Sequence, residues 1–206
     1  MLTIQQWKKM LIAAALKLQA ESKYLCELDS VAGDGDHGIT IGRMAEAIKT
    51  RAEGTEIEDI KGFLDDIGML CMGINGGSAG PLWGTIFCGL AECAPEAKTE
   101  ITAVEFKTML RQAKIDFQDI SKAKVGDKTM VDALYPAFDA AIEAPDKVEA
   151  MLEAAAKAAV EGAAKTKDYV AKFGRAKNVG EGSLGHEDPG AVSTSFLFVA
   201  MNEAIH

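Results

Sequence analysis

Residues 28–44 read LDSVAGDGDHGITIGRM, a short glycine-rich acidic loop between two segments with helical patterns. Asp29, Asp34 and Asp36 lie within eight consecutive positions, and the only cation within this stretch is Arg43. Carboxylates this close raise one another's pKa unless a cation lies among them. Their hard oxygens suit Mg²⁺, Ca²⁺ or Mn²⁺ rather than Zn²⁺. We therefore expect the three aspartates to hold a metal, with a plain acidic turn as the alternative.

Three familiar motifs are excluded by their surroundings. Gly33, Gly35 and Gly38 fit G-x-G-x-x-G, but that pattern binds dinucleotides only after a strand, and the preceding KYLCELD continues a helical pattern. An EF-hand loop counted from Asp34 would place Ala45 where a bidentate Glu is needed. No G-x-x-x-x-G-K-[ST] occurs, so the chain is not a P-loop protein.

The composition favours one helical domain over residues 1–206. Aromatic residues make up only 6% of the chain, while Ala, Leu and Met are abundant. The net charge of −9, without a dense basic cluster, argues against a nucleic-acid partner. No apolar run is long enough to cross a bilayer and no signal-peptide cleavage site follows the first helix, so we expect a cytoplasmic protein that does not bind membranes. The cysteines have no C-x-x-C spacing and are expected to be reduced thiols: Cys26, Cys71, Cys88 and Cys93.

Helical periodicity and start signals recur along the whole chain. Thr3 with Gln6 forms a capping box, and Thr102 with Glu105 forms another. Similar start signals occur at positions 129 and 132 and at positions 146 and 149. No segment shows the alternation of a strand. We expect eight helices, over about 3–28, 41–51, 58–72, 79–92, 102–122, 129–144, 146–173 and 190–206.

The loops between these helices fall into two alternating kinds. Those after the second, fourth and sixth helices are plain: AEGTEIE, APEAKTE and EAPD. Those after the first, third, fifth and seventh are rich in glycine and charge: DSVAGDGDHG, GINGGSAGP, SKAKVGDK and FGRAKNVGEGSLGHEDPG. Short connections require antiparallel neighbours, so alternate loops lie at the same end of a bundle. The expected fold is an all-α, eight-helix antiparallel up-down bundle with its functional site in the loops at one end.

That end has the parts of a nucleotide–Mg²⁺ site. The helix predicted to begin near Ser78 offers free N–H groups for a phosphate, and Gly76 and Gly77 allow close approach of the backbone. Arg175 can bind phosphate through two hydrogen bonds. Carboxylate-held Mg²⁺ would bridge the acidic loop to an anionic ligand. The alternatives are an ordinary helix cap at Ser78 and a solvated arginine at position 175.

Other residues in these loops have two possible roles each. His37 and His186 could contact phosphate, act as a general base or carry a phosphoryl group, or simply hydrogen-bond a loop carbonyl. Asp188-Pro189-Gly190 is a typical helix start that could also bind ligand. Met130 could form the floor of a purine pocket or belong to the core.

GDGDHG, NGGSAGPLWG, GDKTM and GRAKNVGEGSLGHEDPGA, in this order, resemble the nucleotide-binding L subunits of dihydroxyacetone kinase over nearly the whole chain. The resemblance implies an eight-helix antiparallel barrel with the nucleotide, ADP or ATP, at one end. It also implies that Asp29, Asp34 and Asp36 hold two Mg²⁺ ions that bridge the nucleotide phosphates.

The resemblance further implies a set of nucleotide-binding positions. Thr40 stands where the family pattern has Asn, Ser121 where it has Gly, and relatives also have the Ser78-Ala79 pair in reverse order. We expect Arg175 and His37 to take part in the chemistry. The full expected set is His37, Gly38, Ile39, Thr40, Gly77, Ser78, Ala79, Ser121, Met130, Arg175, Asp188, Pro189 and Gly190.

The implied function is phosphoryl transfer to dihydroxyacetone or a similar small ketose held on a separate K subunit. The chain shows no substrate domain, which favours a separate subunit whose bound ADP is rephosphorylated by a phosphotransferase-system phosphocarrier. Alternatives are a ketose or polyol kinase subunit with exchangeable ATP, a nucleotide-sensing module, and a metal-dependent phosphohydrolase that uses His37 as base. A homodimer is a further assembly left open.

Overall fold

Nine α-helices, three short 3₁₀ helices and one pair of two-residue strands make up the computed structural model, which describes residues 1–206. The α-helices are α1 (Ile4–Ala20), α2 (Ser22–Asp29), α3 (His37–Gly54), α4 (Ile60–Met72), α5 (Ala79–Glu92), α6 (Ala103–Ile120), α7 (Val131–Glu143), α8 (Val148–Lys165) and α9 (Pro189–Ile205). The remaining elements are β1 (Leu2–Thr3), β2 (Glu100–Ile101), η1 (Thr166–Asp168), η2 (Arg175–Asn178) and η3 (Gly180–Ser183).

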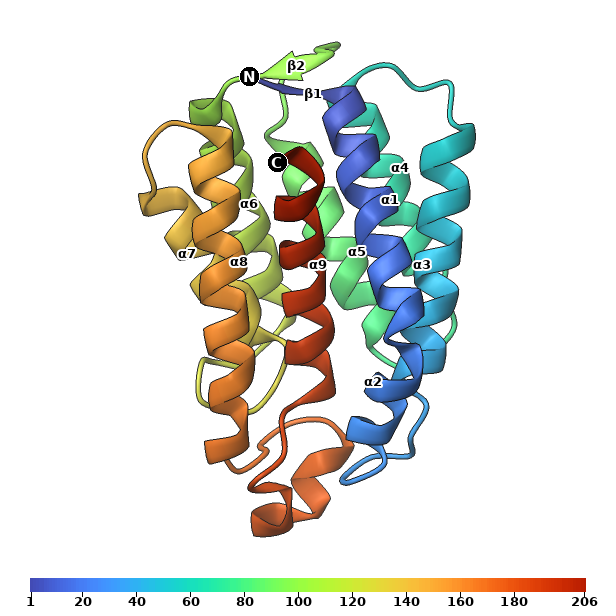
Figure 1. The fold of residues 1–206 in the computed structure, drawn as a ribbon, viewed down its shortest axis with the longest axis vertical. Coiled ribbons are helices and arrows are strands. Elements are labelled where there is room, and N and C mark those ends of the chain that lie inside the picture. The colour runs from blue at the N-terminus through green and yellow to red at the C-terminus, as the bar shows by residue number, and fades with distance from the viewer.

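The long helices form a closed ring. Each one packs against its neighbour in the chain, from α3 on α4 through to α8 on α9, and α1 packs against both α3 and α9. Figure 1 shows these helices running up and down around a common core. The helices α1 and α2 are separated only by Glu21 and together count as one helix of the ring. The ring therefore has eight members and confirms the expected eight-helix antiparallel barrel.

Local sequence signals explain several helix starts. Both capping boxes form, with the Thr3 side chain accepting from Gln6 N–H and the Thr102 side chain accepting from Glu105 N–H. The barrel interior is one hydrophobic cluster, whose aromatic rings meet edge to face, as Trp7 and Phe106 do at 5.5 Å between centroids. The largest fully buried side chains are Trp7, Trp83, Phe63, Phe87, Phe117 and Phe138.

The first and second expected helices differ from the observed ones. The helix expected over 3–28 breaks at Glu21, next to Ser22, whose hydroxyl donates to the Gly38 carbonyl of α3 at 2.7 Å. The helix expected to begin at Ile41 begins instead at His37, because Gly38 packs tightly against α2 despite its low helix propensity.

The seventh expected helix is also shorter than its pattern suggested. It ends at Lys165 rather than near residue 173, and the Thr166 carbonyl accepts from the buried ammonium of Lys128. Its start was assigned wrongly as well. Asp146 does not cap it, since this carboxylate accepts from Lys107 Nζ at 2.6 Å, and the N-cap is Lys147 without a side-chain bond.

The two ends of the barrel are unlike each other. The end that holds the N-terminus carries β1 and β2, a short antiparallel pair that the sequence patterns did not predict (Figure 1). The opposite end, at the bottom of Figure 1, carries the four glycine-rich loops, as the alternation of loops predicted. All four cysteines are free thiols. None of the helices is long and apolar enough to cross a membrane.

Candidate functional site

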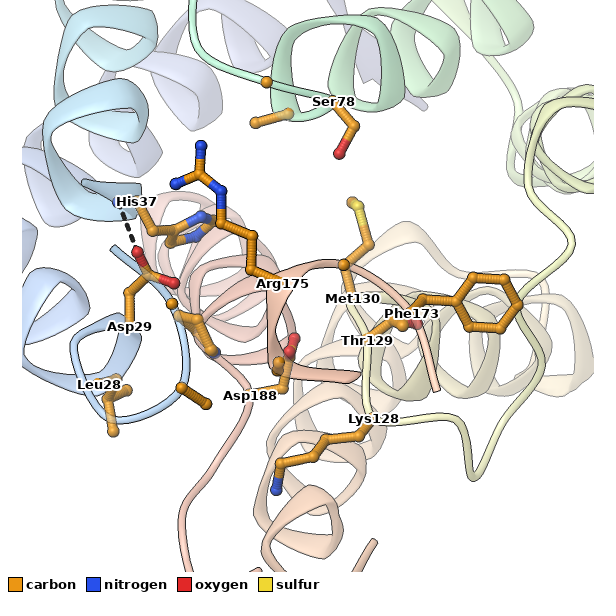
Figure 2. A pocket seen from close by; sticks show the side chains of 18 of the residues that line it. Leu28, Asp29, His37, Ser78, Lys128, Thr129, Met130, Phe173, Arg175 and Asp188 are labelled. Carbon is orange, nitrogen blue, oxygen red and sulfur yellow. Dashed lines mark hydrogen bonds between the residues drawn. The ribbon is translucent and has the colours of Figure 1, made fainter. Parts of the chain in front are cut away.

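A cavity of about 440 Å³ opens among the four glycine-rich loops. The segments that line it come from Leu28–His37, Gly76–Trp83, Ser121–Val131 and Phe173–Gly190. Figure 2 shows side chains from these separate segments facing one another across the cavity. Its wall is mixed, with carboxylates on the α2–α3 side and apolar groups of Phe117, Met130 and Phe173 on the other.

The three aspartates predicted to hold a metal come together at this cavity. Carboxylate oxygens of Asp29, Asp34 and Asp36 all lie within 4.8 Å of one another. The Asp29 carboxylate is held in place because it accepts from the backbone N–H groups of Asp36, at 3.0 Å, and His37, at 3.3 Å. A set of hard oxygens at this spacing fits Mg²⁺.

The cation beside this cluster comes from a distant part of the chain. The Arg175 guanidinium pairs with the Asp34 carboxylate, although 141 residues separate them in sequence. Arg43, which follows the acidic loop in the sequence, donates instead to the Asn75 carbonyl at 3.3 Å. The sequence therefore identified the acidic cluster, and the fold supplied the charge that faces it.

Two glycines allow the acidic loop to approach its supports. A Cβ on Gly33 would lie 2.3 Å from Asp29 Oδ1, and one on Gly38 would lie 1.8 Å from the Ser22 carbonyl oxygen. No side chain fits at such distances, so both contacts require glycine. These contacts hold the start of α3 against α2 and fix the position of the aspartates between the two helices.

His37 is fixed by contacts from two sides. Its Nε2 lies 3.0 Å from Ser193 Oγ, in a hydrogen bond whose donor is set by the imidazole tautomer. Burial lowers the pKa of His37, while the Asp29 carboxylate and the Pro189 carbonyl act in the opposite direction. The imidazole is thus a neutral, oriented group at neutral pH rather than a mobile one.

The N-terminus of α5 points its backbone N–H groups at the same cavity. Gly77 has φ of 63°, which turns the chain sharply into the helix. Ser78 is the N-cap, yet its side chain makes no capping bond. The first N–H groups and the Ser78 hydroxyl therefore stay free for a ligand, which is the arrangement that binds phosphate at helix starts.

Asp188 begins α9 and faces the cavity as well. Its carboxylate accepts from Ala191 N–H at 2.7 Å, so Asp188 is the N-cap of α9. This confirms the helix start expected here, while ligand binding by Asp188 stays a prediction. Burial raises the pKa of Asp188 to about 7, with Asp132 adding to the shift and Lys128 opposing it. A carboxylate poised in this way can also accept a hydrogen bond from a bound ligand.

Lys128 is a residue of this site that the sequence analysis missed. It is only 4% exposed, and its ammonium donates to the carbonyls of Thr166 and His186. Its backbone has φ of 59°, which is rare for a residue other than glycine. The signal in the sequence is its place in GDKTM, one of the four segments that carry the family resemblance.

The predicted nucleotide-binding residues do not all line the cavity. Gly38 and Thr40 are buried behind it and Ile39 is 51% exposed outside it, so their contacts with nucleotide stay predictions. Met130 is both core and wall, since it is 7% exposed and lines the cavity. The expected residues that do line the cavity are Asp29, Asp34, Asp36, His37, Gly77, Ser78, Ala79, Ser121, Met130, Arg175, Asp188, Pro189 and Gly190.

Comparison with known proteins finds one family over most of the chain. The family model described as DAK2 domain matches residues 31–203. The chain is 36% identical over 180 residues to the PEP-dependent dihydroxyacetone kinase, ADP-binding subunit DhaL, of Escherichia coli (strain K12), with 86% of this chain and 85% of that protein covered. It is 34% identical to the corresponding subunit of PEP-dependent dihydroxyacetone kinase 1 of Listeria innocua, with 90% and 88% covered.

Longer proteins match the same domain. The L-erythrulose 1-kinase of Mycolicibacterium smegmatis is 33% identical, with 87% of this chain but only 32% of that protein covered. The dihydroxyacetone kinase of C. freundii, solved in complex with AMP-PNP and Mg²⁺, superimposes with a TM-score of 0.72 at 27% identity, covering 95% of this chain and 33% of that chain. The barrel therefore occurs both as a separate chain and as one part of a larger kinase.

Proposed function

Because the chain belongs to the DAK2 domain family, we propose that it is the ADP-binding subunit of a dihydroxyacetone kinase, a phosphotransferase. Relatives with this name match more than four fifths of both chains. The observation that carries the proposal is a single cavity with three carboxylates within 4.8 Å, a free helix N-terminus and a loop arginine. Each comes from a different loop, so their meeting is a product of the fold.

The cavity suits a nucleotide diphosphate or triphosphate with Mg²⁺. Asp29, Asp34 and Asp36 would hold the metal, which when bound neutralises phosphate charge and bridges the phosphates to the acidic loop. The free N–H groups at the start of α5 and the Ser78 hydroxyl bind phosphate oxygens from the opposite side. Three carboxylates are enough for two Mg²⁺ ions, and the proposal includes two.

Arg175 and His37 are the residues proposed for the chemistry. A guanidinium at the mouth of the cavity stabilises the negative charge that develops on the transferring phosphoryl group. His37 is held by Ser193 and kept neutral by burial, which suits a hydrogen-bonding partner of the ligand more than a phosphoryl carrier. His186 has an exposed side chain, and its backbone carbonyl accepts a hydrogen bond from the Lys128 ammonium.

The acceptor is proposed to reach this rim on a second protein. Phosphoryl transfer depends on holding donor and acceptor in line, so a ketose-binding K subunit must dock over the cavity. A phosphocarrier of the phosphotransferase system would then return a phosphoryl group to the bound ADP. The L-erythrulose kinases among the relatives favour a second candidate, in which the acceptor is another small ketose and ATP is the donor.

The test is reconstitution of the kinase activity, with and without a K-type subunit and with two alternative phosphoryl donors. The purified chain with Mg²⁺, ATP and dihydroxyacetone should give little product, and addition of a K-type subunit should restore turnover. A phosphoenolpyruvate-driven phosphocarrier in place of ATP distinguishes the two donors, since labelled ADP should then stay bound through many cycles. Rapid phosphorylation of dihydroxyacetone by the chain without a partner would contradict the proposal.

A further inference from the structure

One buried ammonium closes the base of the segment that carries Arg175. The Nζ of Lys128 donates both to the Thr166 carbonyl, where the segment leaves α8, and to the His186 carbonyl, shortly before α9 begins. The two acceptors are 20 positions apart, and Arg175 lies between them. A single side chain thus holds both ends of residues 166–186, which we call the arginine segment.

Backbone contacts tighten the same base. Thr166 is fully buried, and its hydroxyl oxygen accepts from Asp188 N–H at 2.8 Å. Gly185 N–H donates to the Lys167 carbonyl at 2.8 Å, which pairs the two ends of the arginine segment directly. The start of α9 and the end of α8 are therefore joined at the point where Lys128 binds.

A second contact holds the arginine segment from the outside. The Lys172 ammonium pairs with Asp127 Oδ1 at 2.6 Å, and the Lys172 N–H donates to the Asp127 carbonyl at 3.1 Å. Asp127 and Lys128 are consecutive, so one short stretch before α7 binds the arginine segment at Thr166, Lys172 and His186. Lys128 reaches inward because its φ is 59°, a strained conformation that has to be stabilised by its surroundings.

We propose that Lys128 is a positioning residue for phosphoryl transfer, which holds the arginine segment so that the Arg175 guanidinium faces the aspartate cluster. The inference rests on the proposed function for the role of Arg175. In Figure 2 the Arg175 side chain extends toward His37 and Asp29, while the Lys128 side chain extends the other way. Lys128 thus acts on the chemistry through the backbone that carries Arg175.

This role differs from a contribution to the stability of the barrel. Replacing a buried ammonium by a methionine of similar length removes the cost of burying charge, so global stability need not fall. The His186 carbonyl loses its donor, however, and the arginine segment has few apolar contacts to replace it. We therefore expect Lys128→Met to loosen this segment more than the helices.

The first experiment needs no ligand. Hydrogen exchange of the purified chain should show faster exchange in the arginine segment, residues 166–186, of Lys128→Met, with the amides of α1 and α9 unchanged. The matched control is Lys107→Met at the opposite end of the barrel, where Lys107 likewise donates to a loop carbonyl, that of Ala144, at 2.6 Å. If Lys128→Met fails to fold, Lys128→Gln is measured in the same way. Unchanged exchange in the arginine segment would show that Lys128 does not hold this segment, whatever the protein's function.

The second experiment is a double-mutant cycle in the reconstituted kinase. Lys128→Met should lower kcat by about tenfold or more, because misplacing a transfer group by about 1 Å has effects of this size or larger. In an Arg175→Ala background the same change should lower kcat by less than about twofold, since the residue being positioned is gone. Lys107→Met should leave kcat unchanged in both backgrounds.

The outcomes separate the two proposals. Equal losses from Lys128→Met in both backgrounds would show that it acts independently of Arg175 and would overturn the positioning role. If the wild-type chain neither binds Mg·ADP nor supports transfer with any K-type subunit, the proposed function fails, and the exchange experiment still decides whether Lys128 holds the segment. Loosening of the segment together with a non-additive loss of kcat supports the inference.

Discussion

Gly38 allows the closest approach between α2 and α3, and replacing it tests how the metal cluster is positioned. A Cβ at this position would lie 1.8 Å from the Ser22 carbonyl oxygen and 2.8 Å from Cys26 Sγ. The carbonyl is backbone, so it cannot turn aside as a flexible side chain could. Gly38→Ala must therefore separate the two helices by roughly 1.5 Å to restore ordinary contact distance.

The energy of that separation follows from two opposing terms. Overpacking of this kind costs about 1–3 kcal/mol, and alanine regains up to about 1 kcal/mol of helix propensity. The net loss of up to about 2 kcal/mol should lower the Tm by up to about 8 °C. The effect on binding should be larger, because Asp29 accepts from the N–H of His37, directly before Gly38. A shift well above about 0.5 Å spoils a binding constellation, so Mg·ADP affinity should fall by at least about tenfold.

Gly42→Ala is the matched control, one helical turn further along α3. Its Cβ would meet Ser22 Oγ at 3.4 Å, an ordinary contact, so this change should raise the free energy of unfolding by about 0.5–1 kcal/mol and leave binding unchanged. Thermal melts and calorimetric titration with Mg·ADP measure both effects. Equal melts and equal affinities for Gly38→Ala and Gly42→Ala would refute the tight contact between α2 and α3.

Four further predictions concern charges and ligands at the cavity. Asp36→Asn should abolish Mg²⁺-dependent ADP binding with little change in the ligand-free melt, because Asp36 is exposed and makes no capping bond; tight Mg·ADP binding by this variant would remove Asp36 from the metal site. In the wild type, ADP with Mg²⁺ at about 100 times its Kd should add about 2.7 kcal/mol and about 5–10 °C to the Tm, and EDTA should remove most of it; a Tm indifferent to both would contradict the shared site. Arg175→Ala should lower the transfer rate with a K-type subunit while the ligand-free Tm stays nearly constant, since its pair with Asp34 is exposed; an unchanged rate would make Arg175 a surface arginine. The pKa of Asp188 is raised to about 7, above its unfolded value of about 3.9, so the folded chain holds this proton more tightly. The free energy of unfolding should therefore decline as pH rises from about 4 to about 7, and Asp188→Asn should flatten this decline in pH-dependent melts; an identical slope would place the titration elsewhere.

Much of the fold could be predicted because its signals are local. The capping boxes at Thr3 and Thr102 depend on side chains three positions apart, and both form as expected. The antiparallel order of the helices and the functional end followed from loop lengths and from the alternation of plain and glycine-rich loops, since short connections force neighbouring helices to run antiparallel. Closure of the helices into a barrel was implied by the family resemblance.

Helix ends were less predictable, because contacts from other elements decide them. Periodicity carries the pattern of α8 on past Lys165, but the Thr166 carbonyl is bound by Lys128 and the chain turns there. The helix expected from about residue 41 begins at His37, where α2 supplies the surface on which Gly38 packs. Such contacts join distant positions and leave no periodic trace in the sequence.

In the candidate site, too, some features follow from the sequence alone and others only from the tertiary structure. By itself the sequence determined that Asp29, Asp34 and Asp36 share one short loop, because they lie within eight consecutive residues, and that a helix starts near Ser78. Only the tertiary structure decided which distant groups face that loop: Arg175 beside Asp34, and Lys128 at the base of the segment that carries it. Those meetings depend on closure of the ring of helices, which brings four loops to one rim, and the direction of each side chain there is set by packing across the barrel.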